Sequence, residues 1–252
     1  MRFTHFFFLL YFFVFLNCKQ EKIQLYKIEG KQIAISDSIT ANSEIESFIK
    51  PYRINIQKDL DSVLAYSLDT YSKTDGELNT ALGNFMADLI YSEANPIFKS
   101  RTKKDIDMVL LNHGGIRGIL NRGNISKRTA FQLMPFENNI VVVALKKPQI
   151  DSLIDYLSKQ KKAHPISKLK LTLDKNYHVI EAKIKGKEIV NNQTYYVATS
   201  DYLYNGGDNM NFFKPNDTLY RLDYKIRNAI IDNFIKLDTI KPVIDNRFTQ
   251  IK

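Results

Sequence analysis

Two glycine pairs, each placed soon after a short apolar run, constrain this chain more than any other feature. The first stands in "IDMVLLNHGGIR" and the second in "YYVATSDYLYNGGDN". Glycine lets the backbone turn sharply and lets backbone N–H groups approach a ligand closely. The pattern therefore favours two strands that end in ligand-binding loops, although a strand followed by glycines is also typical of a plain structural turn.

The spacing of apolar residues predicts the helices. Over residues 79–94 one helical face carries Leu82, Phe85, Met86, Leu89 and Ile90. Four more segments have helical spacing or a helix start signal: 42–64, 126–133, 148–160 and 222–237. Within the first of them, Pro51 is expected to bend or interrupt the helix, because proline has no N–H to donate.

Strand patterns fill most of the space between these helices. Strands are predicted over 63–71, 106–112 and 139–145 and at the start of "YYVATS". Between Lys168 and Val190, strand-like segments are separated by "DKN" and "KGK", which suits antiparallel pairing. Residues 23–36 alternate around Glu29-Gly30 and predict a hairpin. With no repeat and no flexible linker, the chain is predicted to form one mixed α/β domain over 37–252.

The N-terminus has the pattern of an export signal. Arg2 is followed by an eleven-residue apolar run, 6–16, and then by Cys18, the only cysteine. A bilayer span needs about 20 apolar residues, so the run fits a signal-peptide core better. We interpret 1–17 as a lipoprotein-type signal peptide, Cys18 as the lipid-attachment site and 18–36 as an N-terminal segment. A plain secretory signal with an incidental cysteine is the alternative.

The charge balance is basic, with a formal net charge of +9. A basic surface suits nucleic acid, anionic lipid or phosphorylated ligands. The lysines, however, are spread along the chain, and the densest cluster, 159–162, ends a predicted helix, where cations complement the helix dipole. The sequence therefore argues against a nucleic-acid partner.

Side chains around the glycine pairs suit a nucleotide. Arg117 offers a planar fork for phosphate, and Asp208 can accept the two hydrogen bonds of a ribose diol. Phe136 and Tyr202 offer flat faces that can sandwich a base, and Asn138 an amide for its polar edge. Each residue also has an ordinary structural interpretation, as a core ring or a turn former.

Together these motifs resemble the C-terminal domain of 5'-nucleotidases, a group that includes periplasmic nucleotidase/UDP-sugar hydrolases and surface ecto-5'-nucleotidases. The matching blocks are "LGNFMADLI", "NHGGIR", "GNISKRTAFQLMPFENNIVVVAL" and "YYVATSDYLYNGGDN". The resemblance implies an α/β fold of α+β type with mixed sheets layered with helices. It also implies the substrate-binding residues, which are Asn112, Gly114, Gly115, Arg117, Phe136, Asn138, Tyr202, Gly206, Gly207 and Asp208.

Two features depart from the family pattern. Family members often carry an arginine shortly before the "LGN" glycine, where residues 76–78 offer none. Family nucleotidases also hydrolyse phosphate with two metal ions in a separate N-terminal domain. None of the four histidines stands in an Asp-x-His, Gly-Asn-His or His-x-His motif. We therefore expect no catalytic residue, metal site or cofactor in this chain, and two divalent metals in a partner metallophosphoesterase.

Three functions remain open from sequence. The chain is the nucleotide-recognition part of a split 5'-nucleotidase, a nucleoside- or nucleotide-binding lipoprotein that acts alone, or a structural surface domain that has lost its ligand. In each case we expect an exported protein, anchored to the membrane by lipid, on the periplasmic or the outer side.

Overall fold

A computed structural model describes residues 24–251 of the chain, which divides into two compact units, residues 1–49 and 50–252. Cys18 and the signal sequence lie outside the described residues. Residues 24–42 are exposed and form no strand, so the predicted hairpin around Glu29-Gly30 is wrong. Two strands alone are at best marginally stable in water, and no strand of residues 24–251 pairs with this segment.

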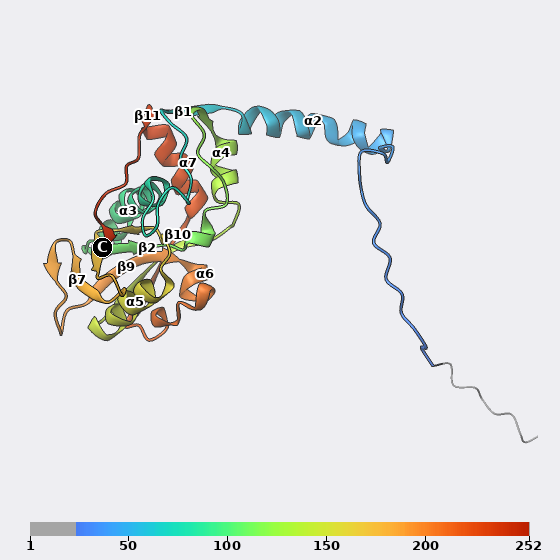
Figure 1. The fold of residues 1–252 in the computed structure, drawn as a ribbon. Coiled ribbons are helices and arrows are strands. Elements are labelled where there is room, and N and C mark those ends of the chain that lie inside the picture. Colours follow the sequence, from blue (N-terminus) through green and yellow to red (C-terminus); the bar gives the residue numbers. More distant parts are fainter. Residues whose placement is uncertain (1–23, 252) are drawn as a thin grey trace, which may run out of the picture. The chain divides into compact units, whose positions relative to one another are not determined.

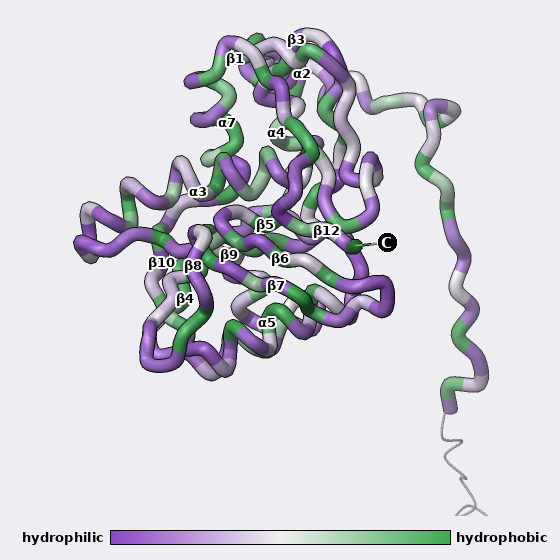
Figure 2. The backbone as a smooth tube through the Cα atoms, turned by 60° about the vertical axis from the view of Figure 1, so that its left-hand side comes forward, coloured by the Kyte–Doolittle hydropathy of each residue, from purple (hydrophilic) through white to green (hydrophobic). Residues whose placement is uncertain are grey.

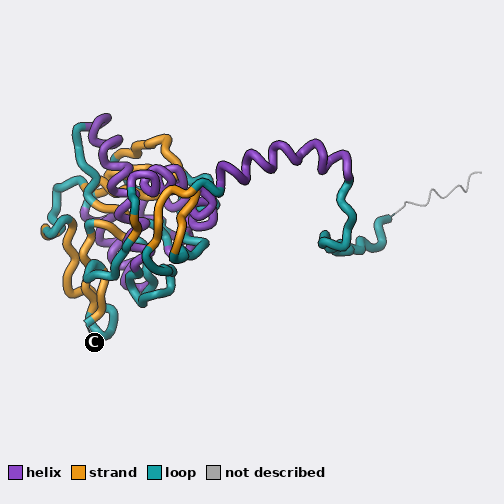
Figure 3. The backbone as a smooth tube through the Cα atoms, turned by 90° about the horizontal axis from the view of Figure 1, so that it is seen from above, coloured by secondary structure: helices purple, strands orange, loops and turns teal. Residues whose placement is uncertain are grey.

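Helix α2 (Ser43–Leu60) is continuous through Pro51 (Figure 3). The expected interruption does not occur, because proline removes one backbone hydrogen bond and the bonds on either side persist. The helix begins after Asn42, whose side-chain oxygen accepts hydrogen bonds from the N–H groups of Glu44 and Ile45, at 2.9 and 3.1 Å. Such a cap satisfies N–H groups that have no partner within the helix.

A five-stranded mixed sheet forms the centre of the second unit. Its order is β10 (Thr218–Lys225), β4 (Asn139–Leu145), β9 (Tyr195–Ser200), β2 (Met108–Leu110) and β5 (Ile166–Ser167). Strand β4 is antiparallel to both β10 and β9, β9 is parallel to β2, and β2 is antiparallel to β5. The two glycine loops follow β2 and β9, which are neighbours. Because the two strands are parallel, both loops leave the sheet at the same edge.

The central sheet separates two hydrophobic cores. On β4, Ile140 and Val142 belong to one core, and Val141 and Val143 to the other. This explains why the strand is apolar throughout instead of alternating. The first core is closed by α3 (Ala81–Thr102) and α7 (Ile226–Lys236), and the second by α5 (Lys147–Gln160) (Figure 1). Hydrophobic and hydrophilic residues alternate along α5 in Figure 2, as expected of a helix with one buried face.

Two smaller sheets flank the central one. Strands β11 (Thr239–Ile240), β1 (Val63–Ser67) and β3 (Gly123–Ser126) form one. The other contains β12 (Phe248–Gln250), β6 (Leu169–Leu173), β7 (Val179–Ile184) and β8 (Lys187–Glu188). The antiparallel pairing predicted around "DKN" and "KGK" is confirmed by β6–β7 and β7–β8.

The helix predicted over 222–237 begins only at Ile226. Residues 218–225 form β10, in which Leu219 pairs with Val143 and Arg221 with Val141. Pairing with the buried strand β4 outweighs the local helical spacing, since β10 covers an otherwise open edge of the sheet. The mixed α/β fold predicted from sequence is confirmed. In residues 24–251, no helix has the length and apolar character needed to cross a membrane.

Candidate functional site

The loop after β2 is shaped by Gly115. A Cβ on this residue would lie 2.6 Å from Oδ1 of Asn112, closer than any side chain tolerates. Glycine thus lets the Asn112 side chain fold back over the loop, where its Nδ2 donates to Oδ2 of Asp208 at 2.8 Å. At the end of the loop, the N–H of Arg117 donates to the carbonyl of Leu133 at 2.9 Å, which ties the loop to the end of α4 (Lys127–Leu133).

The loop after β9 presents Asp208. The short helix α6 (Asp201–Tyr204) follows the strand, and Gly206 (φ 92°) and Asp208 (φ 52°) adopt left-handed conformations. A Cβ on Gly207 would lie 2.4 Å from the ring of Tyr202, so glycine is needed for the ring to lie there. The Tyr202 hydroxyl donates to Oδ1 of Asp208 at 3.0 Å, and this hydrogen bond raises the tyrosine pKa. Tyr156 donates to the Asp208 carbonyl at 2.9 Å and holds the loop from α5.

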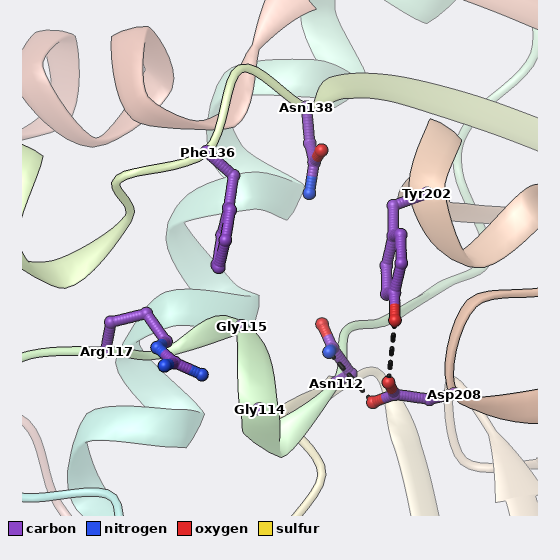
Figure 4. Close-up of a pocket in the computed structure, with 8 residues that line it drawn as sticks. All are labelled: Asn112, Gly114, Gly115, Arg117, Phe136, Asn138, Tyr202 and Asp208. Carbon is purple, nitrogen blue, oxygen red and sulfur yellow. Dashed lines mark hydrogen bonds between the residues drawn. The ribbon is translucent and has the colours of Figure 1, made fainter. Parts of the chain in front are cut away.

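A third loop, between α4 and β4, brings in Phe136 and Asn138. The carbonyl of Asn138 accepts from the N–H of Ile226 at 3.0 Å, so the loop is anchored to the start of α7. Phe136 is 40% exposed and Tyr202 45% exposed, although both are large aromatic residues. Figure 4 shows the two rings facing each other across an open space, with Asn138 between them.

These three loops enclose one cavity of about 240 Å³. Eight of the ten residues predicted for the site line it: Asn112, Gly114, Gly115, Arg117, Phe136, Asn138, Tyr202 and Asp208. The other two, Gly206 and Gly207, do not line it but support the turn that carries Asp208. Arg117 lies at the opposite side from Asp208 (Figure 4), with its guanidinium carbon 5.9 Å from the centre of the Phe136 ring. The cavity therefore has two aromatic walls, one cationic side and one anionic side.

Sequence reasoning missed a second cation beside Arg117. Lys73 donates from Nζ to the carbonyl of Ile116 at 2.7 Å. Burial, and then the charge of Arg117, lower the pKa of Lys73. Among the described residues neither cation is paired with a carboxylate. Two uncompensated positive charges next to each other favour a bound anion. No local motif surrounds Lys73, so no sequence pattern points to it.

Sequence reasoning also missed Arg227, which lies behind Phe136. Its side chain is 8% exposed and forms an ion pair with Glu137. Its Nη1 also donates to the Phe136 carbonyl, at 3.5 Å, and its guanidinium carbon lies 4.1 Å from the centre of the Phe131 ring. Arg227 thus contacts the backbone that carries the first aromatic wall, without lining the cavity.

The segment 76–78, in which the family arginine is missing, is not part of this site. It lines a different cavity, together with Ile244 and Phe248. Nor do the described residues fit a dimetal centre, since no three histidine, cysteine or acidic side chains in residues 24–251 gather as metal ligands.

Comparison with known proteins identifies similar sequences and folds. A family model described as "5'-nucleotidase, C-terminal domain" matches residues 61–215. A cell wall protein of Listeria monocytogenes is 26% identical over 217 residues, which are 79% of this chain and 27% of that protein. The trifunctional nucleotide phosphoesterase of Bacillus subtilis is 24% identical over 250 residues, 91% of this chain and 16% of that protein.

Among solved structures, the 5'-nucleotidase precursor from Thermus thermophilus has a similar fold. The TM-score is 0.68 at 19% identity, and the match covers 82% of this chain and 43% of that one. The chain thus spans less than half the length of these relatives.

Proposed function

The chain belongs to the 5'-nucleotidase C-terminal domain family, and we propose that it recognises a nucleoside or nucleotide for a separate dimetal phosphoesterase. The observation that carries this proposal is the pair of exposed rings, Phe136 and Tyr202, facing each other across the 240 Å³ cavity. Exposed aromatic faces held apart are otherwise unfavourable, and a flat base would bury both. Stacking contributes about 1–3 kcal/mol per base.

Asp208 is proposed to hold the ribose. A carboxylate offers about four acceptor positions, and the side chains of Asn112 and Tyr202 occupy two of them. Two positions remain, which is the number that a 2',3'-diol requires. The same two donors fix the orientation of the carboxylate before the ligand arrives, so that less entropy is lost on binding.

Arg117 and Lys73 are proposed to face the phosphate. The guanidinium offers paired donors for phosphate oxygens, and the half-buried Lys73 ammonium, bonded to the Ile116 carbonyl, adds a second charge next to Arg117. Lys73 lies three residues before the segment 76–78, in which the arginine usual in the family is missing. In this proposal it supplies the missing positive charge.

Hydrolysis is assigned to a partner. In the proposed arrangement, a metallophosphoesterase on a second polypeptide carries two divalent metals, and this chain supplies specificity. The greater length of the relatives supports a function shared with further sequence. We expect the purified chain to show no turnover of AMP with manganese, zinc or magnesium. Metal-dependent hydrolysis that persists through purification and scales with the protein would overturn this part of the proposal.

Export and anchoring are proposed on the signal sequence. Cleavage after residue 17 would leave Cys18 as an acylated N-terminus. The similarity to a cell wall protein is consistent with export. Cys18→Ser is expected to move the protein from the membrane fraction to the soluble fraction of fractionated cells. Unchanged membrane retention would contradict lipid anchoring.

Titration calorimetry of the purified chain with adenosine and AMP tests the recognition role. Phe136→Ala and Tyr202→Ala are each expected to make the binding free energy of adenosine less favourable by about 1–3 kcal/mol. Tyr66→Ala is the matched control, because this ring is about equally exposed, at 41%, but does not line the cavity. If the chain is folded and binds no nucleoside, it is instead a structural surface domain. Co-purification with a phosphoesterase distinguishes the split enzyme from a binder that acts alone.

A further inference from the structure

A second cavity, of about 310 Å³, adjoins the first. Gly114 and Asp208 line both cavities and form a common wall. Neither Phe136 nor Tyr202 lines the second cavity, so it offers no aromatic clamp. Each of the other residues that line it carries a polar side-chain group: His113, Tyr156, Gln160, Lys162, His164 and Asn209.

His164 contributes a buried donor without a partner. The residue is 3% exposed, and its Nδ1 accepts the N–H of His113 at 3.3 Å. The proton of the neutral ring therefore belongs on Nε2. This atom has no hydrogen-bond partner of good geometry among the described residues, although the Leu111 backbone lies near enough to the ring to act on its pKa. Burial lowers the pKa of His164 to about 4, against the opposing effect of Asp208, so the ring is neutral at pH 7. A buried donor of this kind is favourable only when a ligand or water accepts from it.

Other lining groups can also donate hydrogen bonds. Lys162 brings a positive charge, and Gln160 and Asn209 bring side-chain amides. The one carboxylate, that of Asp208, already accepts from two side chains that line the first cavity, Asn112 and Tyr202. A cation and several donors around a space of this size suit an oxyanion such as phosphate.

The common wall connects this second cavity to the nucleoside. In the proposed function, Asp208 accepts hydrogen bonds from the ribose diol, so the 2' and 3' oxygens lie against the wall that both cavities share. A substituent on one of these oxygens has its nearest polar space in the second cavity, while the other hydroxyl still donates to Asp208.

We propose that the second cavity binds a phosphate carried on the 2' or 3' oxygen of the ribose, so that the chain accepts nucleoside 3'-phosphates and 3',5'-bisphosphates. The inference rests on the proposed nucleoside site and extends it. In a bisphosphate, the 5'-phosphate faces Arg117 and the 3'-phosphate faces Lys162 and the buried imidazole.

Calorimetry on the purified chain tests the second cavity with four probes: adenosine, 5'-AMP, 3'-AMP and adenosine 3',5'-bisphosphate. Lys162→Met is expected to weaken 3'-AMP about tenfold, as for one lost charge-assisted contact. It should leave adenosine and 5'-AMP unchanged. Lys161→Met is the matched control. The ammonium of this neighbouring lysine lies 3.9 Å from the centre of the Tyr177 ring, and the residue does not line the cavity. Its substitution should leave the affinities for adenosine and 3'-AMP unchanged.

Gln160→Leu provides a second variant at an exposed position. It is expected to lower the affinity for 3'-AMP selectively, but by less than Lys162→Met does. The proposal is overturned if adenosine binds but Lys162→Met leaves 3'-AMP unchanged, or if Lys161→Met weakens 3'-AMP equally. If adenosine does not bind, the proposed nucleoside site fails, and this inference fails with it. If adenosine binds but the Lys162→Met result for 3'-AMP is not the expected one, only the second-cavity proposal fails and the nucleoside site stands. The two failures are therefore distinguishable.

Discussion

At the scale of single residues, Asp208 links most of the interactions at the site. Its carboxylate accepts from Asn112 and Tyr202, and its carbonyl accepts from Tyr156. These bonds hold the left-handed backbone at φ 52°, a conformation that aspartate tolerates better than most residues. Asp208 is therefore held at three points, two on its carboxylate and one on its backbone carbonyl.

We predict that Asp208→Asn weakens adenosine by about 1.5–3 kcal/mol, the usual range for hydrogen bonds to a charged group. Free adenine should be affected much less, because only the riboside presents a diol. Calorimetry with both ligands measures the difference. Asp217→Asn is the control, since Asp217 pairs with Lys146 and does not line the cavity. Equal losses for adenine and adenosine would contradict a ribose role.

Arg117→Ala and Lys73→Met are each predicted to lower the affinity for AMP more than the affinity for adenosine, because only AMP carries the phosphate. Arg122→Ala is the control for a general charge effect, since this exposed arginine does not line the cavity. If either site variant weakens AMP and adenosine equally, that residue holds the loop or the ribose instead of the phosphate.

A pH dependence follows from the lowered pKa of Lys73. This lysine loses its proton at a lower pH than an ordinary lysine. The advantage of AMP over adenosine should therefore decrease as pH rises through that pKa, and in Lys73→Met this part of the decrease should be absent. Calorimetry of both ligands over an alkaline pH series measures it. An advantage that falls identically in wild type and Lys73→Met would rule out the lysine as its source.

At the scale of elements, the site depends on how the loops are held by helices behind them. Helix α7 holds the loop of Phe136 and Asn138 through its first turn. The N–H of Ile226 donates to Asn138, and Arg227 contacts Phe136 and Glu137. The aromatic wall formed by Phe136 is thus positioned by residues that do not line the cavity.

We predict that Arg227→Met weakens adenosine by about 1 kcal/mol, because the Phe136 loop loses its support. A double-mutant cycle with Phe136→Ala separates positioning from general destabilisation. When Phe136 is already absent, Arg227→Met should cause little further loss of affinity. Lys225→Met is the control, since it removes the other cation bound to Glu137 but not the contact with Phe136. Fully additive losses in the cycle would exclude a positioning role.

At the scale of the whole molecule, Arg247 ties the C-terminal segment to α3. Its guanidinium contacts the carboxylates of Asp88 at 2.9 Å and Asp245 at 2.7 Å, and it donates to the Ile166 carbonyl at 2.8 Å. Arg247 is largely buried, with 16% of its side chain exposed. The bonds to Asp88 and Ile166 join segments far apart in the sequence, so they form only in the folded chain, whereas Asp245 is two residues from Arg247.

We predict that Arg247→Met lowers the free energy of unfolding by about 1–3 kcal/mol, measured by urea denaturation near pH 7. Burial acts to raise the pKa of Asp245, but its bonds with Arg247 outweigh this and hold the pKa below the usual value. The stability that Asp245 contributes is therefore present above the unfolded-state pKa of about 3.9. It is lost as pH falls through the lower folded-state pKa.

The difference between wild type and Arg247→Met should accordingly narrow in strong acid. Arg128→Met is the comparison, because its pair with Asp61 lies on the surface and should contribute far less. Similar losses in the two variants, or a difference independent of pH, would contradict this role for Arg247.

The sequence by itself determined those features whose cause is local. Strand β4 and helix α5 follow from apolar runs and periodicity, and the start of α4 from Ser126. The glycine loops were recognisable because the residues that shape them are close in sequence, as Gly207 is to Tyr202. Eight predicted residues line one cavity, while their role in binding remains a prediction.

Only the tertiary structure decided what depends on distant partners. Residues 222–225 have helical spacing but form part of β10, because the edge of β4 is available for pairing. Lys73 and Arg227 belong to no motif, and they reach the site only because Ile116 and Phe136 are brought next to them. Such contacts join residues 43 and 91 positions apart in the chain, and no local pattern encodes them. The second cavity likewise exists only where α5 packs beside the two glycine loops, since its lining comes from three separate segments.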